Sequence, residues 1–307
     1  MPQLISAFVT VFFIFGLGFS IQRLWPLGEQ TLTQLSSMVV NILLPCYLFF
    51  TTATSSSTES VSVAPLLTAM GIVVPFCSYL LASLALKPSR VTEEQRPAFR
   101  FSILVANTAF LGIPICEILF GPLGVVYAVL YDFGTTLITL TLGVWELSGG
   151  RLDNWRPLLF NPLIWSVVAG MLWALTGWPV PGWLAAPFET LGDATLPLAL
   201  LVGGALVGDI RSQTLAWRQQ LTGLTFIRLV ATPLIVSMIL LGIDQLDLAK
   251  SVIIVQAAMP VGLTPSIMAK AYGADAQFAA SATLWSTLAS MLTLPLVALL
   301  LVHGLQL

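Results

Sequence analysis

The chain has 307 residues, of which 57% are hydrophobic and only 8% charged, and its formal net charge is −2. Soluble domains normally carry about 25% charged residues, so this composition excludes a chain whose whole surface faces water. It also excludes a nucleic-acid partner, because the sequence lacks the basic footprint that such binding requires.

Apolar runs of membrane-spanning length follow one another along the chain. About 20 apolar residues in a helix cross the hydrocarbon layer, where the backbone must satisfy its own hydrogen bonds. The predicted spans cover residues 3–22, 32–51, 63–86, 98–119 and 122–147, then 159–177, 189–208, 221–243, 249–272 and 276–303. We therefore predict an all-α polytopic membrane protein with ten transmembrane helices in a lipid bilayer.

The longest polar break, Ser148–Arg156, divides the predicted spans into two sets of five. We predict a first five-helix repeat over residues 1–150 and a second over residues 151–307. Because five is an odd number, a duplicated half enters the membrane upside down, which is the inverted-repeat plan of many secondary transporters. Similar proline motifs, Asn41–Pro45 in span 2 and Ala194–Pro197 in span 7, occupy matching places in the two halves.

Basic residues gather in the loops of one predicted face. They are Arg23, Lys87, Arg90, Arg96, Arg100, Arg151, Arg156, Arg211 and Arg218. The loops of the opposite face, near residues 52–62, 120–122, 178–188 and 244–248, contain no Lys or Arg. Since basic residues of short loops stay in the cytoplasm, both termini are expected outside. We expect an integral plasma membrane protein, which in a bacterium means the inner membrane.

The fourth span of each half is interrupted by glycine and proline. Span 4 carries Asn107–Pro114 and span 9 carries Met259–Pro265, and a glycine turn is expected after each, at Gly121 and Gly273. A proline kink is the simpler explanation, since proline is common in membrane helices. Paired interruptions at matching places of two halves instead indicate a binding site near the middle of the bilayer, and we place the candidate site there.

Several strings in these spans resemble those of the auxin efflux carrier family. Residues 107–114, Asn-Thr-Ala-Phe-Leu-Gly-Ile-Pro, are similar to its N-T-x-x-x-G-I-P motif, and residues 258–265 with 269–273 are similar to its ninth span. Weaker similarities lie at Leu44–Pro45, Asn161–Pro162, Pro197–Gly203, Ser286–Thr287 and Thr293–Pro295, so that nearly the whole chain is covered. Bacterial members of this family include carriers of small dicarboxylates, and plant members include auxin exporters.

The resemblance implies an NhaA-like arrangement in which helices 4 and 9 are broken and cross. It also implies a scaffold of spans 1, 2, 6 and 7, a transport unit of spans 3–5 and 8–10, and a homodimer. The implied function is secondary transport of a small organic anion, either auxin-like or a dicarboxylate such as malate or malonate. Transport would follow an elevator mechanism with the substrate at the crossing. The long central loop of many plant members is absent, so regulation through it is not expected.

A broken helix exposes backbone N–H and carbonyl groups, and each half-helix carries about +0.5 elementary charge at its N-terminal end, which suits a carboxylate. Asn107 and Thr108 add an amide and a hydroxyl as donors, although Asn107 capping the broken helix is an alternative. The candidate substrate-binding residues are Asn41, Asn107, Thr108, Gly112, Pro114, Gln256, Met259, Pro260, Gly262, Thr264 and Pro265.

Ionisable side chains inside predicted spans are costly and are usually functional. The candidates for coupling transport to protons or sodium ions are Glu117, Asp132, Arg228 and Lys270. For Arg228 and Asp132, a fixed ion pair between helices or snorkelling to the interface are alternatives. Lys270 lies where the C-terminal end of a half-helix attracts a cation. The coupling ion stays open.

The sequence carries no enzyme motif. Cys46, Cys77 and Cys116 lie in apolar runs without metal-binding spacing, and His303 is the single histidine. A G-x-x-x-x-G-K-[ST] string is absent, so ATP is not the direct energy source, and we expect neither cofactor nor metal. Two alternatives to an anion carrier remain, a cation/proton antiporter of similar fold, although Asp132 stands alone in its span, and an anion sensor that does not transport.

Overall fold

The computed structural model describes residues 2–54, 57–85, 91–150, 160–210, 217–240 and 247–304. Every regular element in these ranges is a helix, and the extended pairing seen within them is a single bridge between Ala106 and Val261. Within the same ranges, six helical stretches are long and apolar enough to cross a membrane: Glu29–Thr54, Ser62–Leu84, Thr108–Leu147, Gly182–Asp209, Arg218–Leu240 and Ala276–Leu301. The predicted all-α membrane class is confirmed, and the ten-span inverted repeat stays a prediction.

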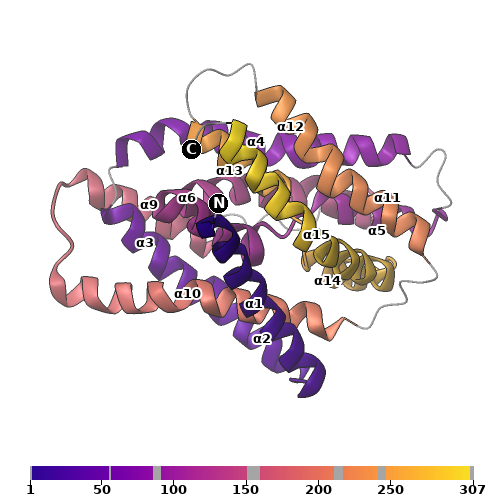
Figure 1. Ribbon diagram of the computed structural model, residues 1–307, viewed down its shortest axis with the longest axis horizontal. Coiled ribbons are helices and arrows are strands. Elements are labelled where there is room, and N and C mark those ends of the chain that lie inside the picture. The colour runs from indigo at the N-terminus through magenta and orange to yellow at the C-terminus, as the bar shows by residue number, and fades with distance from the viewer. Residues whose placement is uncertain are drawn as a thin grey trace. The chain divides into compact units, whose positions relative to one another are not determined.

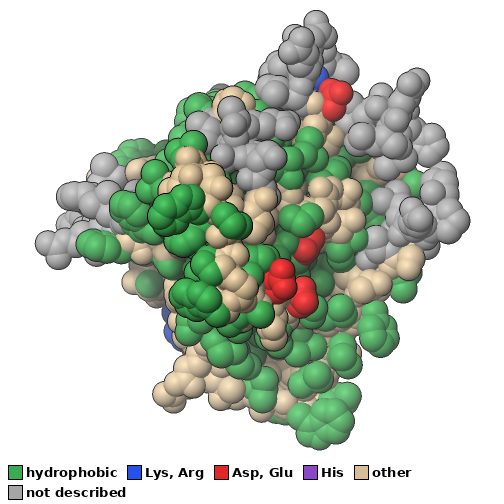
Figure 2. Space-filling model, turned by 90° about the vertical axis from the view of Figure 1, so that its left-hand side faces the viewer, with side chains coloured by type: hydrophobic (Ala, Val, Ile, Leu, Met, Phe, Trp, Pro, Cys, Tyr) green, Lys and Arg blue, Asp and Glu red, His purple; other side chains and the backbone are tan. Residues whose placement is uncertain are grey.

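Part of the basis for the predicted orientation lies outside the described residues. This holds for Lys87, Arg90, Arg151, Arg156 and Arg211, and for most of the linker between the predicted repeats. The surface that is described fits a bilayer, because large hydrophobic side chains such as Phe13, Trp183 and Leu292 are exposed. Figure 2 shows one such face, on which hydrophobic side chains predominate and few acidic ones appear.

The chain divides into two compact units, and each takes segments from both predicted repeats. Unit 1 comprises the described residues of Met1–Leu67, Ala109–Phe133 and Arg156–Asp209. Unit 2 comprises those of Thr68–Thr108, Gly134–Trp155 and Ile210–Leu307.

Unit 1 is held together by close helix packing. Its helices are α1 (Pro2–Leu24), α2 (Glu29–Met38), α3 (Leu44–Thr54), α9 (Pro162–Leu175), α10 (Gly182–Asp209) and part of α6 (Ile113–Ile138). Helix α1 packs along α10, and α3 packs on α9 and α10 (Figure 1). At Gly18 a Cβ atom would overlap the carbonyl oxygen of Leu201, and at Gly204 it would overlap that of Phe15. The backbones of α1 and α10 approach closely because both residues lack side chains.

Unit 2 contains residues 105–107 and 258–263, where two helices stop, whereas residues 109–114 of the interruption predicted in span 4 lie in unit 1. Its helices are the later part of α4 (Ser57–Ala85), α5 (Arg96–Leu104), α7 (Val144–Leu147), α11 (Arg218–Phe226), α12 (Thr232–Leu240), α13 (Asp247–Ala257), α14 (Thr264–Ala271) and α15 (Ala276–Gly304). Helix α15 contacts α5, α11, α13 and α14. Phe99, Ile103, Leu221 and Phe278 form a buried apolar core that also includes Val261.

Wide π-helical turns precede three prolines. The turns are η1 (Val39–Leu43), η2 (Thr108–Gly112) and η4 (Ile227–Ala231), and a fourth, η3 (Thr139–Gly143), has no following proline. Pro45, Pro114 and Pro233 each lack the N–H that would bond the carbonyl four residues earlier, and that carbonyl lies within η1, η2 or η4. The lost hydrogen bond explains why the helix widens at these places instead of ending.

The two predicted glycine turns are confirmed. Gly121 has φ +71° and Gly273 has φ +73°, which is the left-handed region that glycine enters without steric cost. Gly121 bends α6 directly before Pro122, and Gly273 follows the end of α14.

Candidate functional site

The backbone is extended at two places in unit 2 where helices stop. Helix α5 ends at Leu104, and Val105 has φ −102° and ψ 109°. Helix α13 ends at Ala257, and α14 begins at Thr264. The two extended segments lie antiparallel: the Asn107 N–H donates to the Pro260 carbonyl over 2.8 Å, and the Gly262 N–H donates to the Val105 carbonyl over 2.9 Å. Each extended segment thus supplies hydrogen-bond partners for backbone groups of the other.

Side chains of neighbouring helices bond further backbone groups of the second interruption. The Val261 N–H donates to Ser286 Oγ over 3.0 Å, and Thr283 Oγ1 donates to the Gly262 carbonyl over 2.6 Å. The Arg228 Nε–H donates to the Met259 carbonyl over 3.0 Å. The protein therefore supplies partners for these backbone groups, which burial would otherwise leave unsatisfied.

Gly262 is required by the close approach of the two segments. A Cβ atom at this position would lie 2.9 Å from the Ala106 carbonyl oxygen, and both residues are buried. A backbone atom cannot give way as the end of a flexible side chain can, so a larger residue would push the segments apart. Gly262 accordingly shapes the site without offering a side chain to a ligand.

Two buried carboxamides at these interruptions have unused hydrogen-bonding capacity. Asn107 is 3% exposed and Gln256 is 0% exposed. Considering the described residues, Asn107 Nδ2 and both Gln256 Nε2 and Oε1 have no hydrogen-bond partner, and the same holds for the hydroxyl of buried Thr287. An unsatisfied buried polar group costs about 1–3 kcal/mol, so such groups call for an explanation such as a ligand.

The other candidate binding residues fall in both units. In unit 2, Thr108 is buried at the start of η2, Thr264 is exposed at the start of α14, and Pro265 beside it is buried. In unit 1, Gly112 and Pro114 are buried, whereas Asn41 is exposed on η1 and donates to Ser37 Oγ over 2.9 Å. The structure thus gathers Asn107, Met259, Pro260 and Gly262 around one backbone pairing, with Gln256 in the last turn of α13.

The first interruption lies earlier than the proline pattern alone suggests. The non-helical residues are 105–107, at the start of the predicted interruption Asn107–Pro114. Pro114 itself is the second residue of α6. A proline is tolerated in the first turn of a helix because the N–H it lacks would have no partner there. Pro114 therefore widens the helix at η2 and does not itself interrupt it.

The four ionisable candidates lie in different surroundings. Arg228 is 1% exposed and reaches the Met259 carbonyl, as described above. Glu117 is half-buried in α6 and accepts a hydrogen bond of 2.6 Å from the Tyr47 hydroxyl, within unit 1. Asp132 is half-buried later in α6, and Lys270 is exposed in the last turn of α14, where its charge suits the helix dipole.

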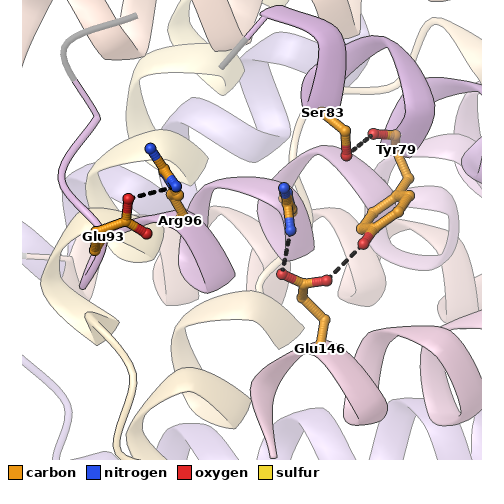
Figure 3. A network of polar contacts seen from close by, with 6 residues as sticks. Tyr79, Ser83, Glu93, Arg96 and Glu146 are labelled. Carbon is orange, nitrogen blue, oxygen red and sulfur yellow. Dashed lines mark hydrogen bonds and ion pairs between the residues drawn. The ribbon is translucent and has the colours of Figure 1, made fainter. Parts of the chain in front are cut away.

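A second polar cluster in unit 2 is one that sequence reasoning missed (Figure 3). Glu146 of α7 accepts hydrogen bonds from the Tyr79 hydroxyl of α4 over 2.5 Å and from Arg100 Nη1 of α5 over 3.0 Å. The Arg100 guanidinium also lies over the Tyr79 ring. The available signal was a glutamate at the end of an apolar run, with an arginine at the start of another. We call Tyr79, Arg100 and Glu146 the Glu146 cluster.

The hydroxyl groups of α15 were also missed as part of the site. Thr283, Ser286, Thr287 and Ser290 are buried, and their spacing of three and four residues places them on one face of the helix. That spacing is visible in the sequence, but Ser and Thr are common in membrane helices, so the pattern alone does not single them out. The described ranges contain no group of three or more His, Cys, Asp or Glu placed to hold a metal ion.

Comparison of the sequence with known proteins assigns the chain to a family. The model of the family described as membrane transport protein matches residues 3–298. An uncharacterized transporter of Methanothermobacter thermautotrophicus is 27% identical over 91% of this chain and 92% of its own length. An uncharacterized transporter of Methanocaldococcus jannaschii is 24% identical over 88% of this chain and 90% of its own length.

Plant proteins match a shorter part of the chain. The probable auxin efflux carrier component 1b of Oryza sativa subsp. japonica is 26% identical over 45% of this chain and 26% of its own length. The family match over nearly the whole chain confirms the resemblance seen in the sequence, and it excludes an enzyme. The chain belongs to the membrane transport protein family, that of the auxin efflux carriers, and is a membrane transporter.

Proposed function

We propose that this transporter is a secondary carrier of a small organic anion, auxin-like or a dicarboxylate such as malate or malonate. The observation that carries the proposal is the pair of buried carboxamides, Asn107 and Gln256, at the two helix interruptions. Plant relatives are named auxin efflux carriers, and auxin is a carboxylate, which adds support for an anionic substrate.

The chemistry of the two carboxamides suits a carboxylate. Asn107 Nδ2 and Gln256 Nε2 are neutral N–H donors, and a carboxylate accepts several hydrogen bonds at its two oxygens. The backbone N–H groups of Asn107, Val261 and Gly262 are already bonded to protein atoms. We therefore assign the recognition of the anion chiefly to side chains, not to the backbone groups freed by the broken helices.

The proposed mechanism is alternating access of the elevator type. In it, a transport unit of spans 3–5 and 8–10 moves against a scaffold of spans 1, 2, 6 and 7, with the substrate where helices 4 and 9 are broken. Unit 2 contains residues 105–107 and 258–263, where two helices stop, which supports a mechanism with two bodies. Residues 109–133 of predicted spans 4 and 5, which the proposal assigns to the transport unit, cluster with unit 1. The inverted repeats over residues 1–150 and 151–307, termini outside, a bacterial inner-membrane location and a homodimer belong to the same proposal.

The energy source in this proposal is an ion gradient or downhill flow. The candidates for coupling transport to protons or sodium ions are Glu117, Asp132, Arg228 and Lys270. Glu117 of α6 accepts a hydrogen bond from the Tyr47 hydroxyl of α3, so protonation of this carboxyl would alter a contact between two helices of unit 1. A cation/proton antiporter and an anion sensor are the competing functions, and measured flux separates them.

The test is flux into liposomes that contain the purified protein. Uptake of labelled malate, malonate and indole-acetate is measured with no gradient, with a pH gradient and with a sodium gradient. We expect uptake of at least one probe above that of empty liposomes. Ion-driven proton flux without anion uptake would favour the antiporter, and binding without any flux would favour the sensor.

Two variants connect the flux to the site. Asn107→Ala removes the donor Nδ2, and we expect the affinity for the transported anion to fall about tenfold, the worth of one hydrogen bond to a charged group. Gln219→Ala is the control, because Gln219 is exposed on α11 and is not among the candidate binding residues. Equal affinity in both variants would remove Asn107 from the site.

A further inference from the structure

Among the residues that the structure describes, Arg228 is the largest fully buried side chain, and it carries a charge. It lies in the π-helical turn η4, within the stretch Arg218–Leu240 that is long and apolar enough to cross the membrane. Moving an arginine from water into this setting costs several kcal/mol unless nearby groups compensate. The contacts of Arg228 therefore indicate which part of the fold its charge stabilises.

One of these contacts stabilises the end of a broken helix. The Arg228 Nε–H donates to the Met259 carbonyl, two residues beyond the end of α13 at Ala257. The last carbonyls of a helix have no partner within the helix, and the C-terminal end carries about −0.5 elementary charge. A guanidinium at this end supplies a charge-assisted hydrogen bond together with the favoured sign of charge.

Local structure aims Arg228 at this carbonyl. Pro233 has no N–H to offer the Leu229 carbonyl, so the helix widens over Ile227–Ala231. Thr232 Oγ1 donates to the Ile227 carbonyl over 2.9 Å and lies 3.0 Å from Ser78 Oγ of α4, which ties the wide turn to its neighbour. The wide turn that carries Arg228 is thus fixed by hydrogen bonds within its own helix and to α4.

We propose that Arg228 is a positioning residue of the transport site, which fixes the end of α13 and thereby the carboxamide of Gln256. This inference rests on the proposed function for its consequence, but its structural part stands independently. Gln256 lies in the last turn of α13, and the Met259 N–H donates to the Gln256 carbonyl over 3.3 Å. Holding Met259 therefore holds the turn that carries Gln256. Arg228 neither contacts the anion nor carries the coupling ion in this role.

The structural part is tested by hydrogen–deuterium exchange of the purified protein without substrate. We expect the backbone amides of residues 258–263 to exchange about tenfold faster or more in Arg228→Met, because a charge-assisted hydrogen bond is lost. Arg228→Lys keeps the charge at the helix end and should restore part of the protection. Arg218→Met is the control, since Arg218 is exposed at the start of the same helical stretch, Arg218–Leu240. Unchanged exchange in Arg228→Met would overturn the proposal.

The functional part is tested by flux of whichever of malate, malonate and indole-acetate the unaltered protein transports best. We expect KM to rise about tenfold in Arg228→Met, with the maximal rate within about threefold and an unchanged response to pH and sodium gradients. Loss of the gradient response at unchanged KM would instead make Arg228 a coupling residue and overturn positioning. If the unaltered protein transports none of these anions, the proposed function fails, while the exchange measurement still decides the structural role.

Discussion

The backbone N–H of Asn107 donates to the carbonyl oxygen of Pro260 across 2.8 Å, and this bond joins the interruptions of two helices far apart in the sequence. Pro260 has no N–H, so it accepts from this neighbour without being able to return a bond. The return bond comes two residues later, from the Gly262 N–H to Val105. This short antiparallel pairing satisfies these buried backbone groups where the two helices stop.

Replacing Gln256 should separate function from stability. Gln256→Leu removes two buried atoms that have no partner among the described residues, so we expect a higher melting temperature and loss of anion binding. The gain in stability should be about 1–3 kcal/mol, the cost of leaving such a group buried and unsatisfied. The measurements are thermal unfolding in detergent and binding of the labelled anion.

Gln219→Leu is the matched control for this change, because Gln219 is exposed on α11. It should alter neither anion binding nor, beyond about 0.5 kcal/mol, stability. A Gln256→Leu protein that binds the anion normally would show that the carboxamide serves the fold alone.

Adding one methyl group at Gly262 should force the interruptions apart. Gly262→Ala places a Cβ atom 2.9 Å from the Ala106 carbonyl oxygen, and we expect a loss of about 1–3 kcal/mol of stability with weaker anion binding. Gly223→Ala has nothing within 4 Å of its new Cβ, and in a helix it should stabilise by up to about 1 kcal/mol. Opposite shifts in melting temperature are thus expected, and equal shifts would contradict the close approach.

The interaction between Arg100 and Glu146 should stabilise the fold more than the exposed ion pair between Glu93 and Arg96 at the start of α5. The side chains of Arg100 and Glu146 are 28% and 9% exposed, whereas those of Arg96 and Glu93 are 40% and 78% exposed. A double-mutant cycle with Arg100→Met and Glu146→Gln should give a coupling energy of about 1–3 kcal/mol.

The same cycle with Arg96→Met and Glu93→Gln should give less than about 1 kcal/mol, because water screens an exposed pair. Chemical denaturation in mixed micelles provides the free energies. Coupling of similar size for both pairs would mean that burial of Glu146 adds nothing to the interaction.

Alanine substitutions at Gly16 and Gly18 of α1 should affect stability differently. A Cβ at Gly18 overlaps the Leu201 carbonyl of α10, while Gly16 has nothing within 4 Å. We expect Gly18→Ala to lower stability by about 1–3 kcal/mol, because α1 and α10 must separate. Gly16→Ala should be neutral or slightly stabilising. Thermal unfolding of the two variants side by side checks this, and a neutral Gly18→Ala would argue against close packing of these helices.

The fold class and part of the candidate site could be predicted from short stretches of sequence. Long apolar runs predict membrane helices because the bilayer offers the backbone no hydrogen-bond partner, and proline and glycine act on their own stretch of chain. Gly121 and Gly273 were located correctly for this reason, and the motifs around Asn107 and Met259 indicated the family. The position of the first interruption was less accurate, because a proline in the first turn of a helix, such as Pro114, does not break it.

The partners of the interrupted segments depend on residues that are distant in the sequence, so no local pattern specifies them. Asn107 with Pro260, Arg228 with Met259, and Gly262 with Thr283 are each brought together only when the helices of unit 2 pack. The identity of a membrane transporter with two broken helices follows from hydrophobicity and from proline and glycine, which act locally. That Asn107 Nδ2 and the Gln256 carboxamide have no partner among the described residues follows from packing, because packing decides which neighbouring groups bond one another.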